Sequence, residues 1–234
     1  MKYAVFGARG RMGSSVTREA RAQSVLLTAL LDCDSQMEIP TGTDVVLDFS
    51  SPTAWADLDK ALSGSPAALV SGTTGLDDAC RAMLERWSRE RAVFYSSNMC
   101  TGVFVLNRLV RQARAMLGEG FDVELVEIHH RNKVDSPSGT ALALLEGSEG
   151  KVVFGRRGNT GVRSGGEVGV HSLRGGDVFG EHQVHLLGQG ERLCLTHMTT
   201  DRSVLALGAL RAARFIAGMA PGLYGMEDML GHGS

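Results

Sequence analysis

The sequence is poor in aromatic residues, in net charge and in long apolar runs, and these shortages exclude several classes of protein. Aromatic residues make up 6% of the 234, and 24 basic and 26 acidic side chains leave a formal net charge of −2. Such a balance provides neither the basic surface of a nucleic-acid binder nor a polybasic membrane patch. No apolar run approaches the roughly 18 residues of a membrane-spanning helix, and the stretch 3–6 is too short for a signal peptide. We therefore expect no nucleic-acid partner and no membrane partner.

The four cysteines show no pattern typical of a disulfide framework or a metal site. Cys33, Cys80, Cys100 and Cys194 are widely scattered, without a CxxC pair or another spacing found among metal ligands. Scattered thiols of this kind are ordinarily reduced, as in cytosolic proteins. We therefore expect a cytoplasmic protein without a metal.

Glycine, in contrast, is abundant. It accounts for 30 of the 234 residues, well above the roughly 7% of an average protein. Such an excess indicates tight turns, loops or close approaches of the backbone to a ligand. Thirteen of the glycines lie between residues 147 and 190, a density incompatible with a long helix. We interpret that segment as glycine-rich loops.

Short apolar runs alternate with helical patterns in the first hundred residues. Short strands separated by crossovers predict a parallel sheet that is covered by helices on both faces. The predicted strands are residues 2–6, 26–31, 45–49, 67–70 and 93–95, and the predicted helices are residues 12–22 and 77–91.

The pattern changes after residue 98. A predicted helix at 103–116 leads into the segment 121–128, whose apolar residues alternate as in a sheet with one covered face. Two further alternating segments, 182–186 and 193–198, indicate a mixed, mostly antiparallel sheet in a second domain. The last long pattern, 203–218, is apolar around most of its circumference, which predicts a helix buried against the sheet or another subunit.

The first predicted strand runs directly into a glycine loop. Gly7, Gly10 and Gly13 have the spacing G-x-x-G-x-x-G, a variant of the dinucleotide fingerprint, and they open a helix whose free N–H groups can hold phosphates. Asp32 directly follows the second predicted strand, at a position where an acid can bind the adenosine ribose. The sequence therefore predicts a nicotinamide dinucleotide site, with an ordinary glycine turn as the alternative.

Asp32 also bears on the choice between NADH and NADPH. A carboxylate would repel a 2′-phosphate, and residues 33–35 supply no cation, although Arg9 and Arg11 could. We expect NADH to be used at least as well as NADPH.

Two further loops follow later strands of the predicted sheet. They are Gly72-Thr73-Thr74-Gly75 and Ser96-Ser97-Asn98-Met99. Ligands of open parallel sheets bind beyond the carboxyl ends of the strands, so both loops would lie beside the nicotinamide. Either could also be a plain turn.

The densest group of reactive side chains follows the predicted strand 121–128. Two histidines, an arginine and a lysine occur within residues 129–133, and a lysine beside other cations has its pKa lowered toward that of a useful proton donor. The hydroxyls of Ser138 and Thr140 stand at the start of a predicted helix, where a carboxylate can be held. Together these residues predict a pocket for a dianionic small molecule, with a solvated basic turn as the alternative.

The motifs together resemble those of the dihydrodipicolinate reductase family, the 4-hydroxy-tetrahydrodipicolinate reductases of lysine and diaminopimelate biosynthesis. The match runs nearly end to end, and the segment EIHHRNKVDSPSGTA at 127–141 is highly specific to that family. The other matching segments are residues 7–13, 48–50, 72–75, 98, 180–182, 190–193, 196–197 and 222–224.

The resemblance implies a fold of the α/β class in two domains. A Rossmann-like domain with a parallel sheet would comprise residues 1–98 and be completed by the C-terminal segment 203–234. An α+β domain at 99–202, with the mixed sheet, would bind a small dicarboxylate substrate and form a homotetramer.

The resemblance also implies the roles of individual residues in an NADH- or NADPH-dependent enzyme. His129 matches the catalytic histidine, Lys133 the proton donor, and His130, Gly139 and Thr140 the substrate contacts. The implied reaction transfers a hydride to C4 of an imine dicarboxylate, with loss of the 4-hydroxyl as water and protonation of the resulting enamine. The cofactor-binding positions would be Gly7, Ala8, Arg9, Gly10, Arg11, Met12, Asp32, Gly72, Thr73, Thr74, Ser97, Asn98, Met99 and Cys100.

The sequence also departs from the family pattern. Only 15 residues separate Asp32 from Asp48, the region after Leu145 is short, and Cys100 stands where relatives often have serine. Two alternative functions remain open. One is a different nicotinamide-dependent dehydrogenase, acting on aspartate or diaminopimelate. The other is a redox sensor that binds NAD(H) without catalysis, which would have no need for both His129 and Lys133.

Overall fold

The structure, a computed structural model, describes residues 1–33, 37–147 and 150–231. The chain forms two compact units, one of Met1–Thr101 with Arg202–Ser234 and one of Gly102–Asp201. In chain order, the second unit is therefore an insertion into the first. Among the described residues, no helix is long and apolar enough to cross a membrane.

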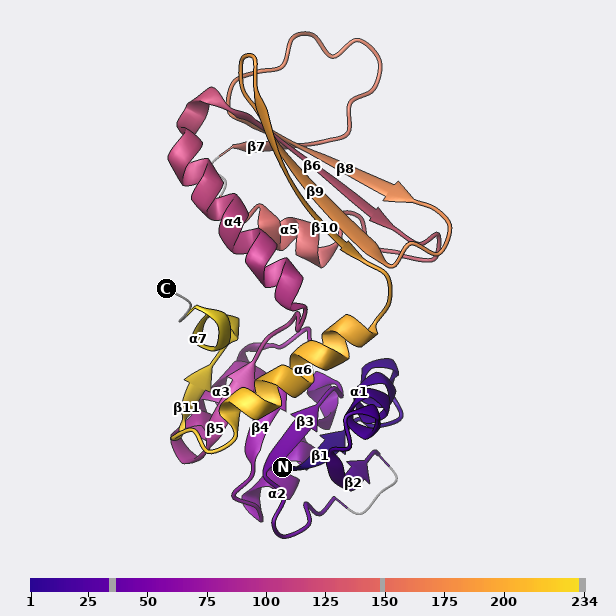
Figure 1. The fold of residues 1–234 in the computed structure, drawn as a ribbon, viewed down its shortest axis with the longest axis vertical. Helices are drawn as coiled ribbons and strands as arrows, with labels where there is room; N and C mark the ends of the chain where they lie inside the picture. The colour runs from indigo at the N-terminus through magenta and orange to yellow at the C-terminus, as the bar shows by residue number, and fades with distance from the viewer. Residues whose placement is uncertain (34–36, 148–149, 232–234) are drawn as a thin grey trace. The chain divides into compact units, whose positions relative to one another are not determined.

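The first unit is built on a parallel sheet with the strand order β11-β5-β4-β3-β1-β2 (Figure 1). Its strands are β1 (Lys2–Phe6), β2 (Leu26–Leu31), β3 (Val45–Asp48), β4 (Ala68–Ser71), β5 (Ala92–Tyr95) and β11 (Gly222–Tyr224). All residues of β3 and β4 are buried, as expected for central strands covered on both faces.

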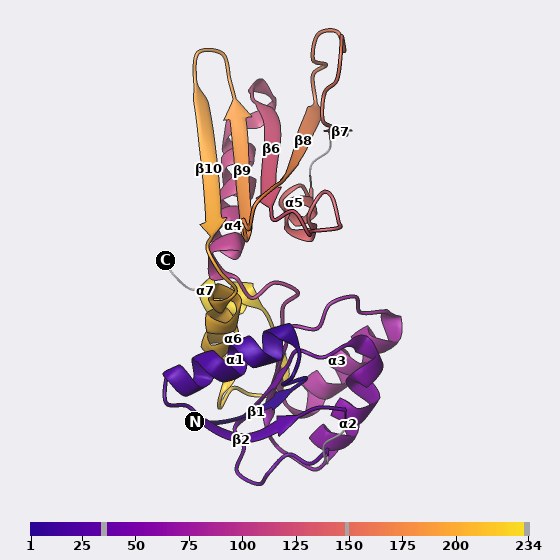
Figure 2. The ribbon, with the colours of Figure 1, turned by 90° about the vertical axis from the view of Figure 1, so that its right-hand side faces the viewer.

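Helices cover both faces of this sheet (Figure 2). One face carries α1 (Arg11–Ala22) and α6 (Ser203–Ile216), which pack on each other. The other carries α2 (Trp55–Ser63), which follows the short helix η1 (Pro52–Ala54), and α3 (Asp78–Glu90). There Trp55 and Trp87 join the core with ring centroids 5.1 Å apart. The chain ends with α7 (Met226–Leu230) after β11.

Helix α6 is buried, as its apolar circumference predicts. Seven of its residues are buried, and it packs on α1 and the central strands. A side chain at Gly208 would collide with the carbonyl of Met99, so glycine is needed for this close approach.

The second unit has a five-stranded mixed sheet in the order β10-β9-β6-β8-β7. Its elements are α4 (Thr101–Leu117), η2 (Gly118–Gly120), β6 (Asp122–His129), α5 (Gly139–Leu144), β7 (Lys151–Phe154), β8 (Glu167–Arg174), β9 (Gly180–Leu187) and β10 (Arg192–Thr199). Strand β9 pairs antiparallel with β6 and β10, and β8 pairs parallel with β6 and β7. Apolar residues of α4, α5, β6, β8 and β9 form a single core on one face of the sheet.

The predicted fold class is confirmed, but three predictions of local structure are incomplete. The glycine-rich segment 147–190 contains β7, β8 and β9 in full, so it is not simply loops. Glycine is needed at position 169 of β8 because Glu124 of β6 occupies the space that a side chain there would take. The helix α2 and the strand β11 were also not predicted.

Candidate functional site

The carboxyl ends of the parallel strands meet at one edge of the first sheet. The register aligns the last residues of five strands, which are Phe6, Leu31, Asp48, Ser71 and Tyr95. The loops that follow these residues therefore start at the same edge, where open parallel sheets bind ligands. This alignment brings together the glycine loop, Asp32 and the loops 72–75 and 96–99.

The glycine loop has the backbone geometry that its spacing predicts. Gly7 has a φ of +77°, in the left-handed region, and a Cβ there would lie 2.8 Å from the Phe49 carbonyl oxygen. A side chain on Gly13 would collide with the Gly7 carbonyl, so Gly13 allows α1 to pack against the turn. Gly10 is the N-cap of α1 and is exposed. The loop therefore offers exposed backbone at a helix N-terminus, which fits a pyrophosphate.

Asp32 lies directly after β2 and holds the glycine loop. Its carboxylate accepts hydrogen bonds from the backbone N–H groups of Arg9 at 2.8 Å and Cys33 at 3.0 Å. The hydrogen bond from Arg9 lowers the pKa of Asp32, so the carboxylate is ionised at neutral pH. An ionised acid at this position fits a ribose and opposes a 2′-phosphate. Asp34 and Ser35, which entered the prediction on cofactor choice, lie outside the described residues.

Asp48, at the end of β3, was not predicted as a site residue although it organises the same edge. Its buried carboxylate accepts hydrogen bonds from the Ser71 hydroxyl at 2.7 Å, the Thr73 hydroxyl at 2.8 Å and the Trp55 indole at 3.1 Å. The Ser50 hydroxyl donates to it as well, at 2.6 Å. Asp48 therefore ties the loops after β3 and β4 to one point.

The remaining predicted cofactor residues differ in exposure. Thr73, Met99 and Cys100 are buried, and the Thr73 hydroxyl is already engaged with Asp48. A side chain at Gly72 would collide with the Phe49 ring, so glycine is required there. Those with at least partly accessible surfaces are Ala8, Arg9, Arg11, Met12, Gly72, Thr74, Ser97 and Asn98.

The second unit holds a buried ionic cluster at the end of β6. The inward face of this strand carries Val123 and Leu125 and then continues with Glu127 and His129. Glu127 is fully buried, and its carboxylate lies 2.5 Å from His129 Nδ1 and 2.6 Å from a guanidinium nitrogen of Arg174 on β8. Neither Glu127 nor Arg174 was predicted as a site residue. The only local signal was that Glu127 and His129 stand two apart on a strand, and therefore on one face.

These contacts determine the charges in the cluster. Burial raises the pKa of Glu127, but hydrogen bonds from Arg174, Ser172 and His129 outweigh it and lower that pKa to about 2. Burial lowers the pKa of His129, and Lys133 and Arg174 act in the same direction against Glu127. At neutral pH the cluster therefore contains an ionised Glu127 and a neutral His129.

A second histidine, His182 of β9, packs against His129. The two rings meet edge to face, with centroids 5.2 Å apart. Burial lowers the pKa of His182 to about 4. Its Nε2 lies 3.0 Å from the Ser138 hydroxyl, which also caps α5 by accepting from Ala141 N–H. His182 lies in one of the segments that match the family, but its place beside His129 was not predicted.

The other predicted residues of the second unit are spread around this cluster. Lys133 Nζ is paired with both oxygens of Asp135, at 2.8 and 2.9 Å. Its nearest charged partner is therefore an acid and not one of the neighbouring cations on which the prediction for Lys133 was based. His130 Nδ1 is buried without a hydrogen-bond partner among the described residues. Ser138 is 2% exposed, and its hydroxyl contacts His182 and the N–H of Ala141. Gly139 is exposed, and a side chain at this position would meet no other atoms.

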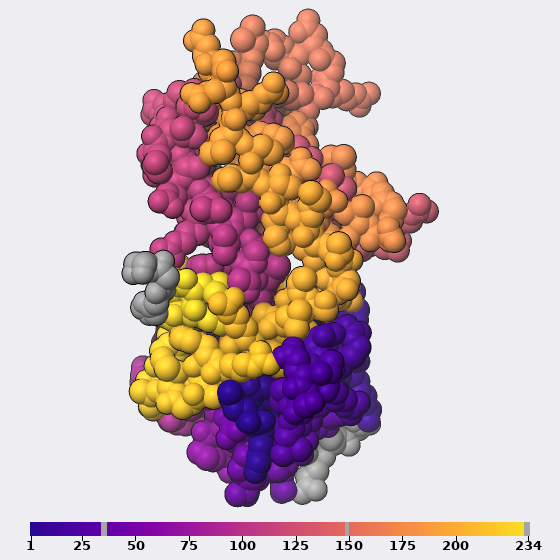
Figure 3. Space-filling model, viewed as in Figure 1, coloured from indigo at the N-terminus to yellow at the C-terminus, as the bar shows by residue number. Residues whose placement is uncertain are grey.

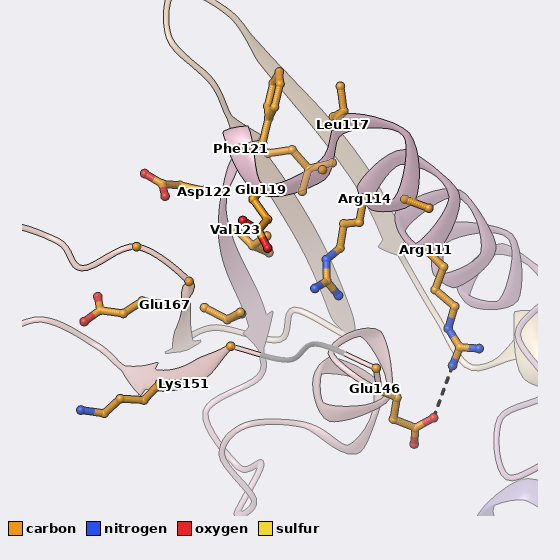
Figure 4. Close-up of a pocket in the computed structure, with 18 residues that line it drawn as sticks. Arg111, Arg114, Leu117, Glu119, Phe121, Asp122, Val123, Glu146, Lys151 and Glu167 are labelled. Atoms are coloured by element: carbon orange, nitrogen blue, oxygen red, sulfur yellow. Dashed lines mark hydrogen bonds and ion pairs between the residues drawn. The ribbon is translucent and has the colours of Figure 1, made fainter.

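A cavity of about 1240 Å³ lies at the opposite end of β6 (Figure 4). Its walls come from the end of α4, the start of β6 and the segments around β7, and they carry charges of both signs. Figure 4 shows Arg111 paired with Glu146 across its rim, at 3.4 Å. None of the predicted site residues lines this cavity, so its size does not mark the reactive site.

Comparison with known proteins identifies the family. Models described as the N-terminus and the C-terminus of dihydrodipicolinate reductase match residues 1–99 and 102–230. The chain belongs to the dihydrodipicolinate reductase family.

Individual relatives agree with this assignment. A protein of Anaeromyxobacter sp. (strain Fw109-5) named 4-hydroxy-tetrahydrodipicolinate reductase is 42% identical, with 97% of this chain and 96% of that protein covered. One of the same name from Wolinella succinogenes is 42% identical, with 97% and 98% covered. A dipicolinate-bound dihydrodipicolinate reductase from Paenisporosarcina sp. TG-14 has the same fold, with a TM-score of 0.74 at 20% identity and 98% and 99% coverage.

Family membership confirms several predictions. The family resemblance, the oxidoreductase class, the use of NADH or NADPH and the role in lysine and diaminopimelate biosynthesis are confirmed. The alternatives of an aspartate or diaminopimelate dehydrogenase and of a redox sensor are thereby set aside. The alignment with the Anaeromyxobacter protein extends over 258 residues, more than the 234 of this chain, so that relative has residues which this chain lacks.

Proposed function

We propose that this chain reduces 4-hydroxy-tetrahydrodipicolinate to tetrahydrodipicolinate, with NADH or NADPH as hydride donor and release of water. The observation that carries the proposal is the position of the family's most specific segment, 127–141. It begins on the buried end of β6 and wraps around the cluster of Glu127 and His129 to the cap of α5. Each unit thus carries one part of the predicted machinery, the cofactor loops in the first and the substrate residues in the second.

The substrate is a dianion, and the second unit provides groups suited to hold it. His130 has a buried nitrogen with no partner among the described residues, and Gly139 leaves open space at the start of α5. With Thr140, these residues are proposed to bind the substrate carboxylates. For Ser138, whose hydroxyl is buried in the cap, the proposed contribution is to hold that loop in shape.

Lys133 is proposed to donate the proton to the ring nitrogen. The bound cofactor supplies the hydride, and the charge that develops on the ring is stabilised best by a preorganised cation beside it. Lys133 is charged and partly exposed, and its link to Asp135 can be exchanged for a link to substrate. His129 is neutral and buried, which suits it to support the site rather than to provide the positive charge.

The activity itself can be tested directly. In an assay coupled to the upstream synthase, the chain should oxidise NADH in proportion to the synthase product. Dipicolinate, a planar analogue of the substrate, should inhibit it competitively. Absence of both NADH oxidation and inhibition would end this proposal.

The role of Lys133 predicts a large loss of turnover on substitution. Lys133→Ala should lower kcat by at least about 100-fold, as expected when a general acid is removed, with NADH affinity little changed. Lys151→Ala removes the same charge from β7 of the same unit, outside the proposed site, and should leave kcat unchanged. Near-normal turnover in Lys133→Ala would contradict the role.

Asp32 is proposed to bind the adenosine ribose through its carboxylate. Asp32→Ala should weaken NADH binding about tenfold, the loss expected for one hydrogen-bonded charged group, and should weaken NADPH binding less because the repulsion of the 2′-phosphate is lost too. Fluorescence titration of both cofactors measures this. Asp57→Ala, on α2, is the control of equal charge change. An unchanged NADH Kd would remove Asp32 from the site.

We also propose that the chain works in the cytoplasm as a homotetramer built through the second sheet. The face opposite α4 and α5 carries exposed Leu173 and Met198, and among the described residues of this unit no element covers it. Figure 3 shows side chains of β9 and β10, in orange, at the surface of the unit. The cysteines are free thiols, consistent with a reducing compartment.

Light scattering after size exclusion tests the assembly. With a chain mass of 24.9 kDa, the tetramer should have about 100 kDa, which is four times that value. Met198→Glu should lower this mass, because a charge on a buried apolar interface is costly. Met116→Glu, at the exposed end of α4, should not. A monomer in the unmodified chain would refute the proposal.

A further inference from the structure

His129 belongs to the proposed reaction, but its protonation is determined by groups that do not themselves take part in that reaction. A neutral imidazole has one N–H and one lone pair, and the partner of each nitrogen decides which tautomer forms. On the side of Nδ1, the partner of His129 is the fully buried carboxylate of Glu127, at 2.5 Å. This residue has no part in the reaction described above.

Besides His129, Glu127 is held in place by two donors, the Arg174 guanidinium and the backbone N–H of Ser138. Arg174 contacts both of its oxygens, at 2.9 and 2.6 Å. The backbone N–H of Ser138 donates to Oε1 at 3.2 Å. The same guanidinium of Arg174 also donates to the carbonyls of Asp135 and Leu173, both at 2.7 Å. The carboxylate therefore cannot turn away from His129 without breaking these bonds.

An ionised carboxylate only accepts hydrogen bonds. Since Glu127 stays ionised, neutral His129 must donate to it from Nδ1, and the lone pair is left on Nε2. Gly180 of β9 lies next to that nitrogen, because a Cβ on Gly180 would be 3.1 Å from Nε2. Glycine at the start of β9 thus leaves room for this edge of the ring.

We propose that Glu127, fixed by Arg174, is a positioning residue that holds His129 in the Nδ1–H tautomer with an unprotonated Nε2 during the reductase reaction. The inference rests on the proposed function for its effect on turnover, but not for the tautomer itself. In metalloenzymes, carboxylates that fix a histidine in this way often affect activity 10- to 100-fold.

Charged and titratable groups face His129 from every element packed against it. Glu127 comes from its own strand, Arg174 from β8, His182 from β9 and Lys133 from the following loop. Among these described groups only Glu127 is negative, so it is the group that stabilises a protonated His129. Glu127 raises the pKa of His129, whereas burial, Lys133 and Arg174 lower it. Removing the charge of Glu127 therefore lowers the pKa of His129 further.

The first experiment compares Glu127→Gln with the unmodified chain in the coupled reductase assay. Turnover should fall about 10- to 100-fold with little change in the NADH Kd. Activity that requires unprotonated Nε2 is lost as the pH falls through the pKa of His129. The acidic limb of the pH profile should therefore move to lower pH in Glu127→Gln, whereas simple loss of folded protein would lower activity without moving the limb.

The matched control is Glu124→Gln on the same strand. Glu124 also contacts a histidine, His171 at 2.7 Å, and the two arginines Arg156 and Arg163, but it lies on the opposite face of the sheet. Once its molecular mass is shown to be unchanged, this variant should keep the turnover and the pH profile of the unmodified chain. A fall in turnover and a shift of the limb as large as those of Glu127→Gln would overturn the proposal.

The second experiment observes the tautomer without activity. Long-range ¹H–¹⁵N spectra of the imidazoles, assigned by the signal lost in His129→Gln, should show Nδ1–H for His129 in the cofactor-free chain. Nε2–H in the unmodified chain would overturn the proposal. Because this readout needs no turnover, an inactive chain with the Nδ1–H tautomer would contradict the reductase function alone.

A third variant covers the case in which Glu127→Gln does not fold. Gly180→Ala keeps Glu127 but forces the ring of His129 to shift by a few tenths of an ångström, given the 3.1 Å approach. Its turnover should fall with the acidic limb in place, because the charge near His129 is unchanged. Unaltered turnover would contradict the need for this position of His129.

The two readouts can also be combined in a folded Glu127→Gln variant. Loss of the Nδ1–H signal of His129 together with normal turnover would show that this tautomer is not needed for the reaction.

Discussion

A carboxylate that is removed from water must be surrounded by donors, and each unit of this chain is organised around one such group. Asp48 is buried at the end of β3 and gathers hydroxyls from the loops after β3 and β4. Glu127 is buried near the end of β6 and gathers a guanidinium, an imidazole and a backbone N–H. Burial of an unsatisfied charge costs far more than any one of these bonds contributes, so each loop is confined to conformations that satisfy its carboxylate.

The parts of the site that could be predicted from the sequence are those that depend on interactions between residues close together in the chain. The spacing of Gly7, Gly10 and Gly13 predicted the tight turn and the close packing of α1, because the positive φ of Gly7 and the approach of Gly13 to the Gly7 carbonyl involve only residues near one another in the chain. Asp32 could be placed at the end of β2 from the apolar run before it. The buried helix α6 could be predicted because its apolar residues surround it on most sides.

The parts that could not be predicted depend on partners distant in sequence or on elements too short to have a period. Arg174 reaches Glu127 across 47 positions, and nothing near either residue indicates the other. Strand β8 was obscured by glycine, although Gly169 is required there by the side chain of Glu124. Strand β11 has three residues, and its place in the sheet follows from pairing with β5 and not from its own pattern.

The insertion of the second unit between Thr101 and Arg202 has a consequence for synthesis on the ribosome. The chain emerges from its N-terminus, so β1 to β5 and the whole second unit leave the ribosome before α6 and β11. Until then one sheet face lacks the helix that contributes seven buried residues, and the edge of β5 lacks its partner strand. The newly made first unit therefore exposes apolar surface and an open strand edge for about a hundred further residues, which is the kind of surface that aggregates or binds chaperones.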